Sequence, residues 1–218
     1  MNLSIPFFSG RRAAAEMVLG DDRELLVGQM HAKHFAAAKA GRVFSQTTTP
    51  LGLAIPIYTA TALGGGALPL WNPPNSGVMV VLQKVNIARA SGTADFATIG
   101  LMARALDAIA TGQVMTALAE VAPINGSLLV GGNKAKTRSS NAGTNTVTAG
   151  AAGDYVRNLF CINLEADTGT AHASTVAEVD FDGTVLVPPG VLVYLAATKA
   201  SVAIYTSTLV WEEIPVPV

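Results

Sequence analysis

Residues 78–90 have the sequence VMVVLQKVNIARA, and this stretch decides the fold class of the chain. Its apolar residues recur with the period of two that is typical of a strand with one buried face, so it predicts a long β-strand. In the predicted register, one face of the strand carries Val81, Val85 and Ile87. The opposite face carries Lys84 and Asn86.

Similar signals lie on both sides of this strand. Strands are predicted at residues 53–61, 78–90, 96–105, 156–164, 175–181, 185–187, 191–196 and 202–211. Pro56 restricts the first to an edge or bulged position. The turn signals are WNPPNSG at 71–77, SGT at 91–93, DG at 182–183 and PPG at 188–190, and the last two leave hairpin-like distances between strands. About eight strands with uneven connections predict an all-β, jelly-roll-like antiparallel β-sandwich.

The chain divides into an arm and a domain. Residues 1–46 hold a large share of the charges and are predicted to form an irregular, partly helical N-terminal arm. A helix is plausible at residues 32–40, because alanine and lysine favour helices, and Gly41 would end it. Residues 47–218 are predicted to form the sandwich, with a long polar loop at 131–154. Residues 106–130 are consistent with helix or strand.

Composition narrows the function classes. Half of the 218 residues are apolar and only 13% are charged, against about a quarter in ordinary domains. The longest uncharged stretch, 44–83, contains five prolines and the triplet Gly64-Gly65-Gly66, so we expect no membrane-spanning helix. A net charge of −1 argues against general nucleic-acid binding. One cysteine, Cys161, excludes an intrachain disulfide and suits assembly in a reducing cytoplasm.

Candidate chemical sites are few. Glu178, Asp180 and Asp182 alternate along a predicted strand, so their carboxylates would share one face. They lack the ligand spacing of a calcium loop, and we interpret them as the solvated face of an amphipathic strand. The three histidines, His31, His34 and His172, are interpreted as surface residues. We therefore predict no catalytic residues, metal or cofactor, and no enzymatic activity.

Partner contacts are predicted in two places. The polar loop carries three cations at alternate positions. They would bind an acidic partner surface or nucleic acid, or be solvated on a mobile loop. The arm carries an apolar run followed by two arginines. The predicted partner-binding residues are Ile5, Phe7, Phe8, Arg11, Arg12, Lys134, Lys136 and Arg138.

Several short motifs resemble a group of virion structural proteins of tailed bacteriophages. They are LWNPPNSG at 70–77, VPPGV at 187–191 and LVWEEIP at 209–215, together with arm segments at 25–31 and 38–44. The resemblance implies a jelly-roll domain that decorates or cements an icosahedral head, commonly as a trimer. It implies no catalytic residues.

The expected function is therefore that of a capsid cement or decoration protein. Its expected partners are the major capsid protein and further copies of itself as a homotrimer, with no membrane and no direct nucleic-acid contact. Its expected location is the capsid surface of the virion, after assembly in the host cytoplasm. The alternatives are a tail, connector or head-fibre component, or a jelly-roll module that binds a carbohydrate or another receptor.

Overall fold

The described part of the chain is built from β-strands. The computed structural model describes residues 34, 37–38, 40–57, 67–92, 97–106, 124–125, 135–139, 154–162, 176–199 and 203–216. The strands are β1 (Val43–Thr47), β2 (Leu53–Ala54), β3 (Ala67–Asn72), β4 (Val78–Ser91), β5 (Ala97–Ala105), β6 (Ile124–Asn125), β7 (Arg138–Ser139), β8 (Asp154–Ile162), β9 (Val176–Val187), β10 (Val191–Ala197) and β11 (Ile204–Pro215). The prediction of an all-β fold is confirmed.

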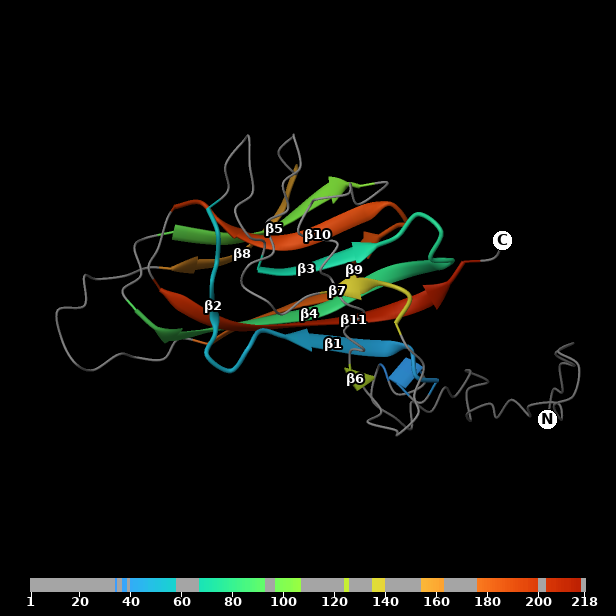
Figure 1. Cartoon of the computed structure of the whole chain (residues 1–218), viewed down its shortest axis with the longest axis horizontal. Coiled ribbons are helices and arrows are strands. Elements are labelled where there is room, and N and C mark those ends of the chain that lie inside the picture. The colour runs from blue at the N-terminus through green and yellow to red at the C-terminus, as the bar shows by residue number, and fades with distance from the viewer. Residues whose placement is uncertain are drawn as a thin grey trace, which may run out of the picture. The chain divides into compact units, whose positions relative to one another are not determined.

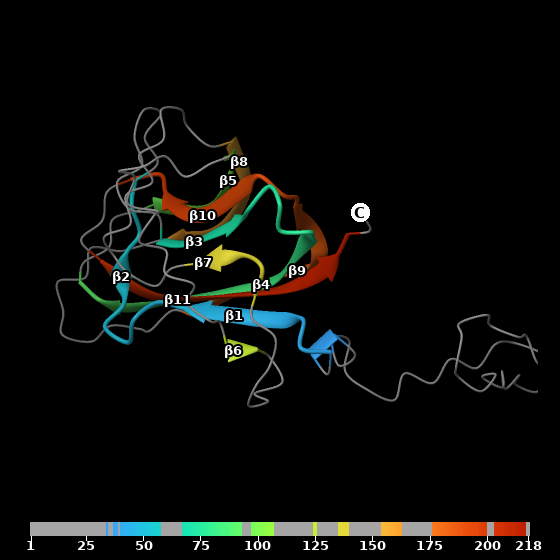
Figure 2. The ribbon, with the colours of Figure 1, turned by 45° about the vertical axis from the view of Figure 1, so that its right-hand side comes forward.

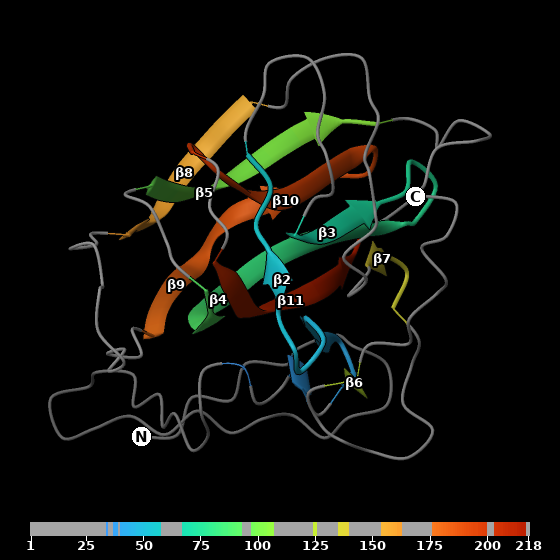
Figure 3. The same ribbon diagram turned by 60° about the vertical axis from the view of Figure 1, so that its left-hand side comes forward.

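The strands form two antiparallel sheets (Figure 1). The first has the order β6-β1-β11-β4-β9, with β2 paired to β11, and the second has the order β7-β3-β10-β5-β8. The sheets lie one over the other as two layers (Figure 2). Strands β8 and β9 end the two sheets on one side of the molecule, and β7 and β6 end them on the other (Figure 3).

The hydrophobic core lies between the sheets and takes side chains from both. Trp211 is fully buried, and its ring centroid lies 6.1 Å from that of Phe44. Leu82, Ile99 and Leu101 are also fully or almost fully excluded from solvent in the same cluster. Burial of large apolar and aromatic side chains is the main favourable term for such a fold.

The alternation of β4 breaks at Gln83. Leu82 pairs with Trp211 and Lys84 pairs with Val210, so Gln83 is an extra residue in the ladder. A bulge of one residue reverses the side on which the following residues project. Val80 and Leu82 therefore join the core before the bulge, and Val85 and Ile87 join it afterwards. The prediction for Val85 and Ile87 is confirmed, whereas the prediction that Val81 shares their face is wrong.

The turn signals around β9 do not make hairpins. Asp182 and Gly183 both have positive φ, at 50° and 72°, as a tight turn requires, but the strand continues past them in the same direction along β4. The predicted strands 175–181 and 185–187 are thus one strand with a bulge in which residues 181–184 lie opposite Gln83. Pro188–Gly190 then leads from β9 in the first sheet to β10 in the second. Both predicted hairpins are therefore wrong.

The predicted polar loop at 131–154 contains ordered structure. Arg138–Ser139 forms β7 and pairs with Leu70 and Trp71 of β3, and Asp154 already belongs to β8. The predicted strand 53–61 is shorter in the described residues: Leu53–Ala54 pairs with β11, and Ile57 forms a single bridge with Ala197. Local composition did not reveal these pairings, because each depends on a partner far away in the sequence.

The predicted helix stop at Gly41 is confirmed. Ala37 and Ala38 lie in a helical turn, and Gly41 follows with φ 68°. The Gly41 N–H donates to the carbonyl of Ala38 (2.9 Å), and the Arg42 N–H donates to that of Ala37 (3.0 Å), which is the Schellman pattern. Strand β1 starts directly afterwards at Val43, so it crosses the predicted arm–domain boundary at residues 46 and 47.

Asn72 forms hydrogen bonds to two connections between the sheets at one end of the sandwich. Its side-chain amide donates to the carbonyls of Val78 and Val187, both at 2.9 Å. The backbone carbonyl of Asn72 accepts the N–H of Gly190 (2.7 Å). One buried asparagine thus joins the β3–β4 turn to the β9–β10 turn. The turn predicted at 71–77 is confirmed.

The first prediction compares two leucines on neighbouring strands of one sheet. Replacing the fully buried Leu82 with alanine should lower the free energy of unfolding by about 2–5 kcal/mol, because a cavity remains in the core. Replacing Leu186, which is 57% exposed, should change it by under about 0.5 kcal/mol. Urea denaturation measures both values. Equal losses in the two variants would contradict the core described above.

The second prediction compares two glycines that both have positive φ. Gly77→Ala should cost about 1–2 kcal/mol, because alanine resists the left-handed conformation and an added Cβ there meets nothing within 4 Å. Gly52→Ala should cost about 1–3 kcal/mol more, because its Cβ would lie 2.6 Å from Ile204 Cγ2 and 2.9 Å from the Tyr205 carbonyl oxygen. Thermal unfolding of both variants checks the order. A smaller loss for Gly52→Ala would show that the chain moves there easily.

Candidate functional site

The strand β11 places a carboxylate inside the sandwich. Its inward-facing residues alternate from Tyr205 through Leu209 and Trp211, and Glu213 is the next member of that series. Glu213 is only 5% exposed. A buried carboxylate is costly unless hydrogen bonds satisfy its oxygens. Its surroundings therefore have to supply donors.

Those donors come from the segment that precedes β7. The backbone N–H of Lys136 donates to Glu213 Oε2 (2.9 Å). The backbone N–H and the hydroxyl of Thr137 donate to Oε1, at 3.0 Å and 2.7 Å. Hydrogen bonds to an ionised carboxylate are stronger than neutral ones. We call Lys136, Thr137 and Glu213 the Glu213 clasp, and it fixes the backbone just before β7.

The same segment is also held to the second sheet. Arg138 pairs with Trp71, and its guanidinium carbon lies 5.7 Å from the centroid of the Trp71 ring, within the range of a cation–π interaction. The indole N–H of Trp71 donates to the carbonyl of Leu106 (2.9 Å), which fixes the ring. The clasp therefore ties β11 of one sheet to the edge of the other.

Two of the predicted partner-binding cations lie on this fixed segment. The side chains of Lys136 and Arg138 are exposed, whereas those of Thr137 and Ser139 between and beside them are buried. The alternation follows from the extended backbone, which projects successive side chains to opposite sides. The segment thus presents two exposed cations on a backbone that is held to Glu213 of β11 and paired with β3. Lys134 lies outside the described residues.

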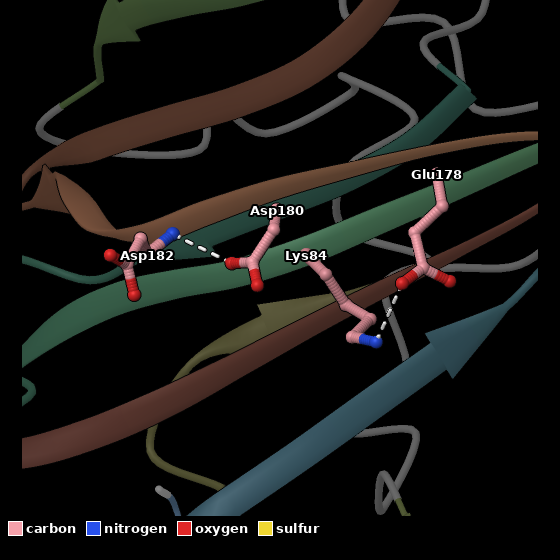
Figure 4. Close-up of polar contacts among 4 residues, drawn as sticks. All are labelled: Lys84, Glu178, Asp180 and Asp182. Carbon is pink, nitrogen blue, oxygen red and sulfur yellow. Dashed lines mark hydrogen bonds and ion pairs between the residues drawn. The ribbon is translucent and has the colours of Figure 1, made fainter.

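The three carboxylates predicted to share a face do so. Glu178, Asp180 and Asp182 are all exposed on one side of β9 (Figure 4). Glu178 Oε1 forms an ion pair with Lys84 Nζ (3.0 Å), and Asp180 Oδ1 accepts the backbone N–H of Asp182 (2.7 Å). Glu178 and Asp180 thus interact with groups of their own sheet, as expected of a solvated strand face. Among the described residues, no group of three His, Cys, Asp or Glu could hold a metal ion.

The other predicted sites lie largely outside the described part of the chain. The partner-binding residues Ile5, Phe7, Phe8, Arg11 and Arg12 are outside it, as are His31 and His172. His34 is described and is half-buried.

Sequence reasoning missed Glu213 and Asn72 as structural residues. The signal for Glu213 is its position in the strand, two residues beyond Trp211. Alternate residues of a strand face the same side, so if Trp211 faces inward, Glu213 does as well. A charged residue at an inward position requires partners, which identifies it as a fixed point of the fold. For Asn72 the signal is weaker, since asparagine is common in turns such as WNPPNSG.

The third prediction tests the clasp with one substitution at two positions. Glu213→Gln should lower the free energy of unfolding by about 1.5–3 kcal/mol, because it removes the charge from three buried hydrogen bonds. Glu178→Gln should cost under about 1 kcal/mol, because Glu178 forms an exposed ion pair. Chemical denaturation gives both values.

Hydrogen exchange gives a second readout of the clasp. At least one of the Lys136 and Thr137 amides should lose protection in Glu213→Gln, because glutamine keeps one accepting oxygen and replaces the other with an NH2 donor. Both amides should keep their protection in Glu178→Gln. Unchanged protection at both amides would rule out the clasp as the interaction that holds this segment.

Within the described residues, no helix is both long enough and apolar enough to cross a membrane. No protein-family model matches the chain, and neither a curated protein nor a solved structure matches it.

Proposed function

We propose that this protein is a non-enzymatic structural component of a bacteriophage virion, a capsid cement or decoration protein that folds as a jelly roll. The observation that carries the proposal is the set of strand pairings. Eight strands have five or more residues: β1, β3, β4, β5, β8, β9, β10 and β11. In chain order, the first pairs with the eighth, the second with the seventh, the third with the sixth and the fourth with the fifth.

These pairings are those of one long antiparallel ribbon that is rolled into two layers. Such a ribbon gives a jelly roll, an architecture that recurs in viral capsid and lectin domains. The fold is compatible with both uses. The resemblance of the LWNPPNSG, VPPGV and LVWEEIP motifs to phage virion proteins favours the capsid.

The segment held by the Glu213 clasp supports contact with an acidic partner. Lys136 and Arg138 project from a backbone that is already hydrogen-bonded on both sides. Binding to such a surface avoids the entropic cost of ordering a loop. We propose that these two cations contact acidic side chains on the outer surface of the major capsid protein.

Repetition strengthens each contact on a shell. An interface of standard size buries about 1,600 Å², and a homotrimer binds through three of them at once. A trimer at a threefold axis would join neighbouring capsomers. Low overall charge, 13% of residues, reduces the desolvation cost of burying such surfaces.

The fourth prediction is that the purified protein is a trimer that sediments with undecorated phage heads. Light scattering gives its mass, and co-sedimentation gives the bound fraction. Bound protein should raise the temperature at which the heads open. A protein that leaves the heads unbound and is retained on a glycan surface would instead identify a receptor-binding module.

A matched pair of variants locates the contact. K136A/R138A should weaken head binding roughly tenfold, which corresponds to about 1.4 kcal/mol. K84A/R89A removes the same net charge from β4 in the other sheet and should bind like the parent protein. Equal binding by both variants would place the contact elsewhere on the molecule.

A further inference from the structure

We infer that β9 is a protected edge strand: its bulge and its outward carboxylates prevent copies of this protein from pairing strand to strand. β9 is the last strand in the order β6-β1-β11-β4-β9, and within the described residues its one strand partner is β4. It spans 12 residues. A long strand with an unpaired side is a template for another chain, so native proteins usually block such edges.

The composition of β9 makes protection necessary. Its sequence is VAEVDFDGTVLV, and without its three acids it would be a nearly continuous run of β-forming apolar residues. The outward row begins and ends with exposed apolar side chains, Val176 at 66% and Leu186 at 57%. The carboxylates Glu178, Asp180 and Asp182 lie between them on that row. Charges placed inside an apolar strand are typical gatekeepers against aggregation.

The bulge interrupts the straight edge near its middle. Asp180 pairs with Lys84 and Val185 pairs with Leu82, so residues 181–184 occupy the space opposite Gln83 alone. The bulge is fixed from within, because Thr184 Oγ1 donates to the Phe181 carbonyl (2.6 Å) and Asp180 Oδ1 accepts the Asp182 N–H. The buried Phe181 side chain anchors it in the core. An incoming strand therefore meets no continuous ladder.

The carboxylates oppose two ways in which the β9 strands of two copies could pair. In an antiparallel pair of β9 strands centred on Asp180, Glu178 would face Asp182 of the second copy, and Asp180 would face its own equivalent. In a parallel, in-register pair each acid would face itself. Like charges directly opposite each other destabilise a strand pair. Lys84 partly compensates the charge of Glu178 in this arrangement.

Sedimentation velocity on the full-length protein tests this inference with two variants. E178Q/D180N removes two charges and retains an oxygen at position 180 that can accept the Asp182 N–H. A second variant deletes residues 182–184 and so straightens the edge. Both should associate beyond the oligomer of the parent protein, at concentrations at least tenfold lower than the parent requires. The control T206K/T208K changes the net charge equally on β11, an interior strand, and should behave like the parent.

Salt gives an independent readout. Association of the parent protein should increase between 0.1 M and 1 M salt, because the Debye length falls from about 10 Å to about 3 Å. Association of E178Q/D180N should depend less on salt. If circular dichroism shows that the deletion variant is unfolded, E178Q/D180N decides the outcome.

A parent-like mass for E178Q/D180N over the whole concentration range would overturn the inference. Head binding by the parent protein is measured separately and bears only on the proposed function, so the two proposals fail independently.

Discussion

The other elements of the fold are arranged around the pairing of β11 with both β1 and β4. The last strand of the chain lies between the first strand and one from its middle, with Trp211 opposite Phe44 on one side and Leu82 on the other. These contacts close loops of more than a hundred residues, and their entropic cost is recovered only when both layers are in place. The free energy gained by burying Trp211 fully in the core contributes to offsetting this entropic cost.

Buried polar side chains then hold one end of the sandwich together. Asn72 joins two turns that cross between the sheets, and Glu213 joins β11 to the segment before β7. Each satisfies several backbone groups that would otherwise be unpaired in a buried place. Because Glu213 holds the backbone before β7, the two cations Lys136 and Arg138 project from a fixed segment. The exposure of these two cations is thus a consequence of how the core is closed.

The irregular positions of the sheets have separate roles. The bulge at Gln83 changes which face of β4 is apolar, so that both halves of a long strand contribute to the core. The bulge at residues 181–184 leaves the inward face of β9 unchanged and alters its outer edge. The first therefore serves packing, and we infer that the second limits self-association. Both use the freedom of a strand to absorb extra residues without losing its ladder.

The structure confirms the strands predicted at residues 78–90 and 191–196, of which the second is a continuous apolar run buried on both faces. The sequence alone was enough to predict this strand content. It also determined the exposed row of carboxylates on β9 and the helix stop at Gly41. Tertiary packing sets the order of the strands, the course of the chain where hairpins were predicted at Asp182–Gly183 and Pro188–Gly190, the reversed face at Val81, and the role of Glu213. Those features depend on residues that are distant in sequence. A local pattern shows that a strand has a face to bury, but the partner that buries it is fixed by packing of the whole domain.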